Sequence, residues 1–365
     1  MARSRELAAL SLISLTPRRN SPVMPLIHED PTNPPGPETV AVLQTAHDVI
    51  VRLRARIAAQ VIGRDDVIEL VVAALLADGH VLLEDYPGSG KTTLAKALGA
   101  AIEEGDAEKF AAFRRIQFTP DLLPSDITGV SVFDARTSAF QFRPGPLFAH
   151  IVLADEINRT SPKVQSAMLE AMAEKQVTVD NVTYPLDELF FVIATQNPRD
   201  VAGTYPLPVP QLDRFLFKIR MKHIARAEEL GVLLTRRERR DIVRADLPRV
   251  TREEVLATRR TLDTMVKVHS SILECLVDIS RTLRSDDRVR QGNSTRSLVL
   301  AVPALQAYAL GRRRDYVSAQ DIEDLVPHIL AHRIEAAIGA TAAEEVVREC
   351  MVGALESLTR RTLGR

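Results

Sequence analysis

The sequence GSGKT at 88–92 contains the residues best suited to bind a chemical group. It follows a short apolar run at 81–83 and leads into a helix-compatible segment. Backbone N–H groups of such a turn can point at phosphate oxygens, and the helix adds the positive end of its dipole. Lys91 can reach the β- and γ-phosphates of a nucleotide, and the Thr92 hydroxyl can bind Mg²⁺. The pattern predicts a phosphate-binding loop made by Tyr86, Pro87, Gly88, Ser89, Gly90, Lys91, Thr92 and Thr93.

This prediction has one departure from the usual pattern and one alternative. Asp85 replaces the first glycine of the usual pattern G-x-x-x-x-G-K-[ST]. The alternative is an ordinary glycine-rich turn with a surface lysine. We favour the phosphate loop, because a strand, a turn, a Lys-Thr pair and a helix coincide only by chance in the alternative.

Two acids, Asp155 and Glu156, end the strongly apolar run at 151–154. Asp155 would hold Mg²⁺ through water, and Glu156 would polarise the water that attacks the γ-phosphate. The alternative is a solvated acidic pair at the start of a helix, where acids are favourable. With Lys91 and Thr92 upstream, the pair predicts ATP hydrolysis.

Two further positions fit a nucleotide site. Asn197 follows another apolar run, and its amide could hydrogen-bond both the attacking water and the γ-phosphate. Asn also favours a turn before Pro198, which is the alternative. Ile62 and Gly63 precede a helical segment and could hold the adenine ring against backbone, although a plain helix–helix turn is equally open.

Two arginines could complete the site. Arg214 lies just before an apolar run at 215–219 and is a candidate arginine finger that acts on the ATP of a neighbouring subunit. The alternative is a surface salt bridge with Asp213 or another acid. Arg296 would start a later helix, from which it could reach the phosphates in its own subunit. Arg159 is a second candidate for the residue that acts between subunits.

These side chains need a sheet edge to hold them. Apolar runs alternate with helical periodicity, which predicts a three-layer αβα core with a parallel five-stranded sheet. We expect the strands at 81–84, 115–118, 151–156, 189–194 and 215–219. Two β-hairpins are expected at 129–143 and 176–184, the second with the two-residue turn Asp180-Asn181.

The chain divides by pattern into three parts. Residues 1–38 are rich in proline and polar residues towards their end, and we expect a flexible leader there. Residues 39–222 would form the nucleotide-binding core with its two hairpins. Residues 223–365 show only helical periodicity, and they would form an all-α lid without strands.

The composition of the chain limits the classes of protein to which it can belong. The chain has 365 residues, 45% of them apolar, and a formal net charge of −1, so no overall basic field favours nucleic acid. Cys275 and Cys350 match no metal or redox spacing and are expected to be idle thiols. No apolar run is long enough to span a membrane. The apolar stretch at 7–15 lacks a small-residue cleavage site, so we expect no signal peptide and a cytoplasmic protein.

Taken together, the ordered motifs resemble the MoxR family of AAA+ ATPases, in the clade that carries a helix-2 insert. The resemblance covers about residues 40–335, and it departs from the family where the usual proline is missing near 223–226. The stretches that carry it are 83–93, 145–147, 155–159, 170–172, 194–198, 203–208 and 211–215.

The resemblance implies a role for each motif. It assigns Lys91-Thr92 to Walker A, Asp155-Glu156 to Walker B, Asn197 to sensor 1, Arg214 to the finger and Arg296 to sensor 2. It also implies ATP and Mg²⁺ as ligands, and a homo-oligomeric ring that is expected to be a hexamer. A chaperone-like role in remodelling or maturing a protein complex would follow, with a von Willebrand A domain protein as partner.

Three other functions are alternatives to this interpretation. A DNA-associated AAA+ motor would share the hairpins, and Arg136 and Arg143 favour it, but the tip at Asp180-Asn181 is not basic. A slow nucleotide-gated scaffold would not need Glu156. A small GTPase would need an Asn-Lys-x-Asp motif, which the sequence lacks.

Overall fold

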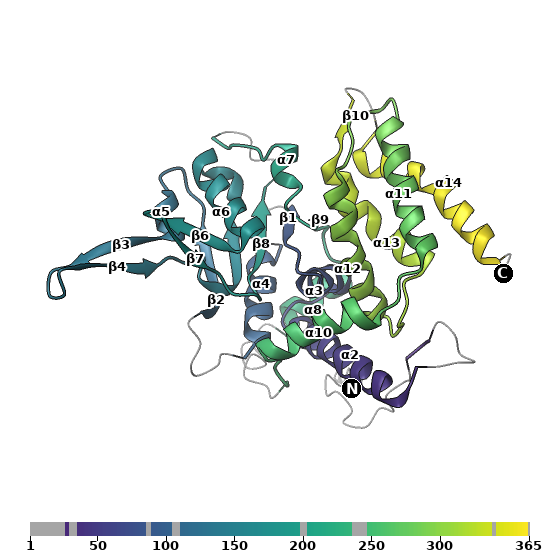
Figure 1. Ribbon diagram of the computed structural model, residues 1–365, viewed down its shortest axis with the longest axis horizontal. Coiled ribbons are helices and arrows are strands. Elements are labelled where there is room, and N and C mark those ends of the chain that lie inside the picture. The colour runs from purple at the N-terminus through teal and green to yellow at the C-terminus, as the bar shows by residue number, and fades with distance from the viewer. Residues whose placement is uncertain are drawn as a thin grey trace, which may run out of the picture.

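The computed structural model describes residues 26–28, 35–84, 89–103, 110–197, 203–235, 247–337 and 341–363. Its centre is a five-stranded parallel sheet in the order β2-β5-β8-β1-β9 (Figure 1). The prediction of a parallel five-stranded sheet is therefore confirmed. The strands are β1 (Val81–Glu84), β2 (Ala111–Gln117), β5 (Ala149–Asp155), β8 (Phe191–Gln196) and β9 (Phe217–Arg220).

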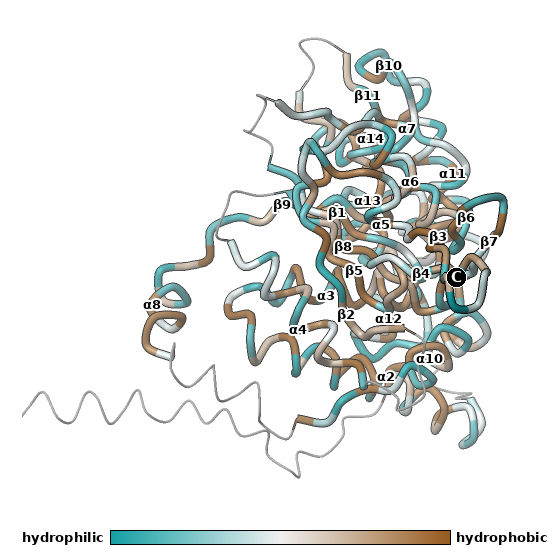
Figure 2. The backbone as a smooth tube through the Cα atoms, turned by 90° about the vertical axis from the view of Figure 1, so that its left-hand side faces the viewer, coloured by the Kyte–Doolittle hydropathy of each residue, from teal (hydrophilic) through white to brown (hydrophobic). Residues whose placement is uncertain are grey.

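Helices cover both faces of this sheet, because successive strand residues point to opposite sides. On one face, Leu83 and its alternate neighbours pack with α2 (Pro37–Ala58), α3 (Asp65–Leu76) and α4 (Lys91–Ala101). On the other face, Leu82 belongs to a second cluster with α6 (Pro162–Glu174). Strands covered on both faces read as continuous apolar runs, as the brown colour of β1, β5 and β8 in Figure 2 shows.

Both predicted hairpins are present. The first pairs β3 (Gly129–Asp134) with β4 (Ala139–Pro144), and it extends well beyond the rest of the molecule in Figure 1. The second pairs β6 (Gln176–Val179) with β7 (Val182–Pro185). Its turn residues Asp180 and Asn181 have φ of 50° and 62°, the left-handed conformation that Asp and Asn tolerate in two-residue turns.

The C-terminal part is mainly helical, as expected, and also contains one small sheet. Its helices are α8 (Arg226–Leu234), α10 (Arg252–Met265), α11 (Ser270–Ser285), α12 (Thr295–Gly311), α13 (Ala319–Leu330) and α14 (Ala343–Leu363). The prediction that this region has no strands is wrong, because β10 (Val289–Gln291) pairs with β11 (Glu335–Ala336). Pairing satisfies the backbone groups of two loops, over stretches too short to show alternation in sequence.

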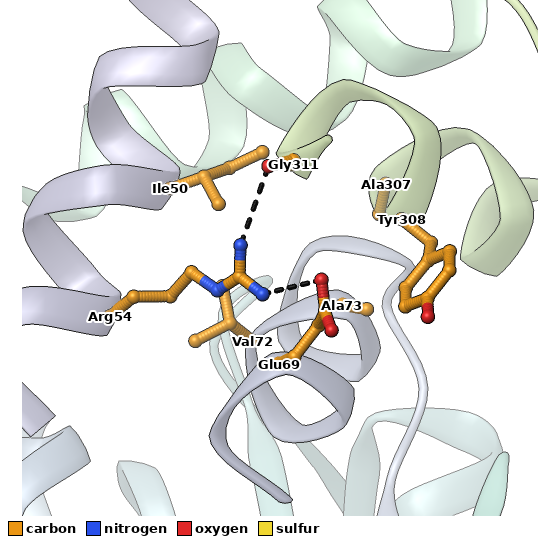
Figure 3. Close-up of a pocket in the computed structure, with 8 residues that line it drawn as sticks. All are labelled: Ile50, Arg54, Glu69, Val72, Ala73, Ala307, Tyr308 and Gly311. Atoms are coloured by element: carbon orange, nitrogen blue, oxygen red, sulfur yellow. Dashed lines mark hydrogen bonds and ion pairs between the residues drawn. The ribbon is translucent and has the colours of Figure 1, made fainter. Parts of the chain in front are cut away.

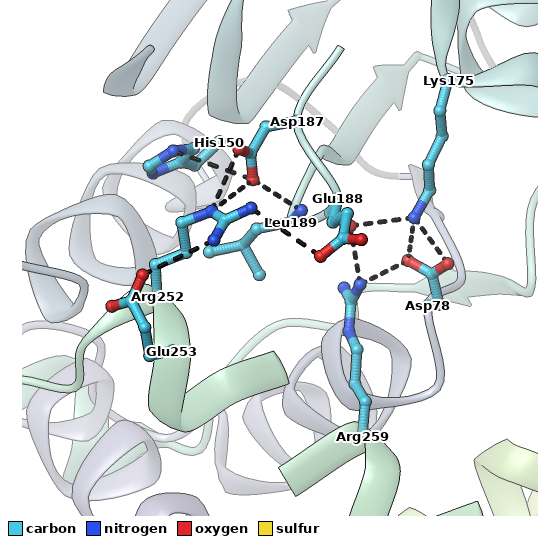
Figure 4. Close-up of polar contacts among 9 residues, drawn as sticks. All are labelled: Asp78, His150, Lys175, Asp187, Glu188, Leu189, Arg252, Glu253 and Arg259. Carbon is cyan, nitrogen blue, oxygen red and sulfur yellow. Dashed lines mark hydrogen bonds and ion pairs between the residues drawn. The ribbon is translucent and has the colours of Figure 1, made fainter. Parts of the chain in front are cut away.

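Helix α10 is attached to the core by arginines (Figure 4). Arg252 Nε lies 2.9 and 3.0 Å from the carboxylate oxygens of Asp187. Arg259 donates to the carbonyl of Leu75 through Nε at 3.1 Å and Nη2 at 2.8 Å, and its Nη1 lies 2.6 Å from Asp78 Oδ1. This helix is therefore bound to the core, and the boundary between residues 222 and 223 stays a prediction.

Part of the expected leader packs on the body. Leu26 is only 6% exposed, and Ile27 exchanges backbone hydrogen bonds with Arg313 and Asp315, at 2.7 and 3.2 Å. His28 Nδ1 lies 2.7 Å from Asp315 Oδ2. The expectation of a flexible leader is therefore incorrect at 26–28, where an apolar side chain is buried and backbone pairing holds the segment. Residues 37 and 38 already belong to α2.

Two other expectations concern single features. Cys275 and Cys350 are both buried and unbridged, and burial is the main cause that raises the pKa of each thiol to about 11. Neither would ionise near neutral pH, as expected of idle thiols.

Among the described residues, no helix is long and apolar enough to cross a membrane.

Candidate active site

The candidate catalytic residues meet at one edge of the sheet. Strand β8 lies between β5 and β1, with Glu84 beside Gln196 and Ala154 beside Ala194. Because all three strands run parallel, their carboxyl ends lie at the same edge. Asp155, Asn197 and the carboxyl end of β1 are thus brought together, at the edge where open α/β sheets bind their ligands.

The phosphate loop is described in part. Asp85, Tyr86, Pro87 and Gly88 lie outside the described residues, whereas Ser89 and those after it are described. The helix expected after the loop is α4, which begins at Lys91, with Thr92 half-buried and Thr93 exposed in its first turn.

Three features of this loop fit a phosphate group. The N-cap of helix α4 is Gly90, which has no side chain to accept from the N–H groups of the first turn, and the start of a helix is a favourable place for an anion. Gly90 has φ of 96°, and a Cβ atom added there would meet none of the described residues within 4 Å. The Ser89 hydroxyl is buried without a hydrogen-bond partner in the described part of the chain. A phosphate oxygen in this open space would satisfy these donors.

Asp155 and Glu156 are fixed by a threonine on the neighbouring strand. Thr195 Oγ1 donates to Asp155 Oδ1 at 2.7 Å and accepts from the Glu156 N–H at 2.9 Å. Arg115 donates to Asp155 Oδ2 through Nη2 at 2.7 Å and Nε at 3.2 Å. Glu156 itself has φ of 58°, so the chain turns sharply there and directs the two carboxylates differently.

The Glu156 carboxylate has two partners that the sequence analysis did not assign to it. Gln117 Nε2 donates to Glu156 Oε2 at 3.0 Å, and Arg159 Nε lies 3.0 Å from the same oxygen. Arg115 Nη2 also donates to Gln117 Oε1 at 2.6 Å. Gln117 could have been noticed in the sequence, because it is a polar residue near the end of a predicted strand. Its position beside β5 could not be predicted without knowing the order of the strands in the sheet.

Glu84, the last residue of β1, is a second residue that the sequence analysis missed. It is 7% exposed, and it accepts from Gln196 Nε2 at 2.8 Å while Lys218 and Arg220 lie 3.0 and 3.1 Å away. Burial alone would raise the pKa of this carboxyl, but its partners outweigh burial and lower it. A buried carboxylate thus ties the strand that leads into the phosphate loop to the strand that leads to Asn197.

The candidate adenine site lies beside the phosphate loop. Arg64 follows Gly63, and it donates to the carbonyl of Ser89 at 3.5 Å and to the carbonyl of Lys222. Gly63 has φ of 70°, and a Cβ atom there would come within 2.5 Å of Glu228 Oε2, so this turn requires glycine. Ile62 is half-buried in the same turn. Their role towards adenine stays a prediction.

The two arginine candidates lie at the boundary between core and lid. Arg214 follows α7 (Val209–Leu212), and its Nη1 donates to the carbonyl of Leu169 at 2.5 Å. The neighbouring Asp213 pairs with Arg333, at 2.9 Å. Arg296 is exposed in the first turn of α12, so it starts a helix as predicted. The roles of Arg214 and Arg296 towards ATP stay predictions.

A small cavity lies elsewhere, between α2, α3 and α12 (Figure 3). Arg54 Nη2 lies 2.5 Å from Glu69 Oε1 in its wall, and Arg54 Nη1 donates to the carbonyl of Gly311 at 3.3 Å. It has room for about one water molecule and includes none of the candidate site residues. The cavity therefore results from the packing of these helices and is not part of the candidate site.

The residues at the sheet edge are compatible with a magnesium ion that is shared with the nucleotide. In the described ranges, no group of three or more His, Cys, Asp or Glu side chains could hold a metal alone. Asp155 accepts three hydrogen bonds where a carboxylate has about four sites, which leaves room for a water ligand of a cation. Mg²⁺ commonly keeps its waters and binds phosphate oxygens with few protein ligands, and here Thr92 would bind the ion while Asp155 would hold it through water.

Comparisons with known proteins agree with this geometry. Residues 80–217 match the ATPase family associated with various cellular activities (AAA), and residues 281–350 match the AAA lid domain. The chain is 46% identical over 316 residues to the uncharacterized protein YeaC of Bacillus subtilis, covering 86% of this chain and 96% of that protein. It is 36% identical over 302 residues to the chaperone MoxR1 of Mycobacterium tuberculosis, covering 78% and 75%.

A solved structure shares the fold. A crystal structure of a candidate ATPase from Cytophaga hutchinsonii superimposes with a TM-score of 0.77 at 31% identity. The match covers 86% of this chain and 97% of that one.

Proposed function

The chain belongs to the MoxR family of AAA+ ATPases, and from this premise we propose that its ATP hydrolysis drives the remodelling or maturation of a protein complex. It is an ATP hydrolase with the helical lid of its family. We further propose that it acts as a hexameric ring in the cytoplasm, where ATP is supplied, with a von Willebrand A domain protein as partner. The family is chaperone-like, as the name of MoxR1 states for that relative.

The observation that best supports this chemistry is the arrangement of polar groups around Glu156. Its carboxylate is held by Gln117 and Arg159 at 3.0 Å each, which would orient it to accept a proton from the attacking water. Lys91 and the first turn of α4 would bind the phosphates, and Asn197 would position the water. A bound Mg²⁺, held by Thr92 and Asp155, would neutralise charge that develops on the phosphates.

The surface of the β3–β4 hairpin favours a protein client over DNA. Phe133 and Phe140 are 54% and 73% exposed, and their rings meet edge to face with centroids 5.4 Å apart. Exposed aromatic rings are enriched at surfaces that bind proteins, whereas binding of a DNA backbone needs cations that contact phosphates. Arg136 at the tip is exposed but lies 3.5 Å from Asp134, which offsets its charge. A DNA-associated motor is the second candidate.

Mixed rings test the site across subunits. We define the donor as a Glu156→Gln subunit, which keeps Arg214, and the acceptor as an Arg214→Ala subunit, which keeps Glu156. Alone, the Arg214→Ala variant should hydrolyse ATP on the order of 10³-fold more slowly than wild type, and the Glu156→Gln variant should bind ATP normally and stall with it bound. Rings purified through two different tags should regain activity, because a donor finger meets an intact acceptor site. If such rings carry no activity above either variant, Arg214 does not act on the neighbour's ATP.

A second measurement separates protein from DNA as the client. The ATPase rate is measured with and without double-stranded DNA, and partners are identified after purification from the native host. We expect no stimulation by DNA and recovery of a von Willebrand A domain protein. Strong stimulation by DNA would favour the motor instead.

A further inference from the structure

The loop that carries Arg214 is bound to the helical lid of its own chain through Asp213. Asp213 Oδ1 accepts from Arg333 Nε at 2.9 Å and from Ser297 Oγ at 3.3 Å, and Asp213 Oδ2 accepts from Ser294 Oγ at 3.3 Å. The two serines flank Arg296 at the start of α12, and Arg333 follows α13. One carboxylate thus contacts two separate elements of the lid.

Arg333 extends this contact to the backbone of the loop. Its side chain is 1% exposed, and it donates to the carbonyls of Asp213 at 3.2 Å, Phe215 at 2.7 Å and Leu216 at 3.1 Å. His332 Nε2 lies 3.0 Å from the same Phe215 carbonyl. Nearly every donor of the guanidinium is therefore used to hold the residues on either side of Arg214.

The electrostatics of this contact make separation costly. Burial is the main cause that lowers the pKa of Arg333, to about 10, and Asp213 offsets part of that effect. The nearby Arg296 lowers the pKa of Arg333 further. Moving the loop away from the lid would leave a buried guanidinium without its carboxylate, which is strongly unfavourable. Loop and lid should therefore move together.

We propose that Asp213 is a positioning residue for hydrolysis in the neighbouring subunit. It fastens the backbone on either side of Arg214 to the lid, while the Arg214 side chain contacts the carbonyl of Leu169 in the core, so that the lid of one subunit helps to set the position of the finger at the ATP site of the next. The inference rests on the proposed function, in which Arg214 acts across the subunit boundary. Asp213 itself contacts no nucleotide in this scheme.

The test adds Asp213→Asn to the donor subunit of the mixed rings, which keeps the shape of the side chain and removes its charge. We expect the kcat of purified mixed rings to fall at least about tenfold, because the finger is misplaced. The KM for ATP should not change, because the acceptor site is intact. The matched control is Glu274→Gln in the donor, which breaks the exposed lid pair of Glu274 with Arg361 and should change neither constant.

The same substitution in the acceptor subunit distinguishes positioning from general stability. The acceptor already lacks Arg214, so Asp213→Asn there should lower the kcat much less than in the donor. Equal losses in both placements would overturn the proposal, as would an unchanged kcat with the donor variant. If Asp213→Asn donors do not enter rings, Ser297→Ala donors replace them and should show a smaller loss of kcat, whereas an unchanged kcat would overturn the proposal.

A failure of the proposed function can be distinguished from a failure of the proposal about Asp213. Mixed rings of the unmodified donor and acceptor would then be inactive before Asp213 is changed. In that case the finger does not act between subunits, and the inference about Asp213 falls with it.

Discussion

Lys91 lies where a single charge should decide nucleotide binding. It begins α4 directly after Gly90, whose positive φ turns the chain so that the first helical N–H groups and the lysine can face one space. In that space the backbone supplies only partial charges, so the ammonium group would be the main cation close to the β- and γ-phosphates.

We predict that Lys91→Ala abolishes ATP binding, measured by equilibrium titration with a fluorescent nucleotide. Lys96→Ala is the matched control, since Lys96 is exposed on the same helix and should be neutral. Micromolar affinity in the Lys91→Ala variant would contradict the assignment of the phosphate loop.

His80, just before β1, is a buried residue that makes stability depend on pH. Its Nδ1 accepts from the Val192 N–H at 3.2 Å, and its Nε2 lies 3.1 Å from the Met172 carbonyl. These partners suit the neutral ring, with the proton on Nε2. Burial lowers the pKa of His80 to about 4 in the folded protein, against roughly 6.5 in the unfolded chain.

We predict that His80 reduces the free energy of unfolding as pH falls from about 6.5 to about 4, because the unfolded chain binds the proton more tightly there. The loss would approach about 3 kcal/mol below that window and be absent above it. Urea denaturation at pH 7 and pH 4.5 measures it. The pH dependence should be shallower in His80→Gln than in wild type, and equal dependences would refute the prediction.

At the scale of elements, arginines fasten α10 to the core where apolar packing alone would allow sliding. Arg259 is 12% exposed, and it joins α10 to the carbonyl of Glu188 and to Asp78 (Figure 4). It also donates to the carbonyl of Leu75. Its planar guanidinium reaches all three partners at once. A lysine has one nitrogen and cannot do so.

We predict that Arg259→Ala lowers the free energy of unfolding by about 2 kcal/mol, because the carbonyls of Leu75 and Glu188 lose a charged hydrogen-bond donor. Arg259→Lys should recover less than half of the loss. The control is Arg260→Ala, an exposed neighbour on the same helix, which should change stability little. Chemical denaturation measures all three variants, and a full recovery by lysine would contradict this account.

At the scale of the whole molecule, one hydrophobic cluster joins the predicted core and lid. It contains Leu53 of α2 and Val71 of α3 together with Leu305 of α12 and Ile329 of α13. Leu26, from the expected leader, belongs to the same cluster. The lid is thus packed on the core in this conformation, and the N-terminal segment adds to that packing.

We predict that deleting residues 1–34 lowers the melting temperature by a few degrees, because the burial of Leu26 contributes about 2 kcal/mol. Deleting residues 1–23 should leave it unchanged, since none of the contacts made by 26–28 is lost. Differential scanning fluorimetry compares the two deletions. An equal melting temperature for both would show that the packing of Leu26 adds no stability.

Apart from the short pair of β10 and β11 and the packed segment at 26–28, the sequence by itself determined the elements and their class. Strands buried on both faces require continuous apolar runs, and helices require apolar residues three and four apart, so both left clear local patterns. The Asp180-Asn181 turn and the start of α4 at Lys91 were likewise set by local backbone preferences. The motifs at 88–92 and 155–156 could be assigned because their chemistry resides in neighbouring residues.

Only the tertiary structure decided which distant side chains meet. Gln117 lies beside Glu156 because β2 pairs with β5, and Glu84 is joined to Lys218 because β9 pairs with β1. Arg333 reaches Asp213 across 120 residues of chain. Strand order and helix packing depend on contacts between segments far apart in sequence, and these contacts leave no periodic pattern in any one of them.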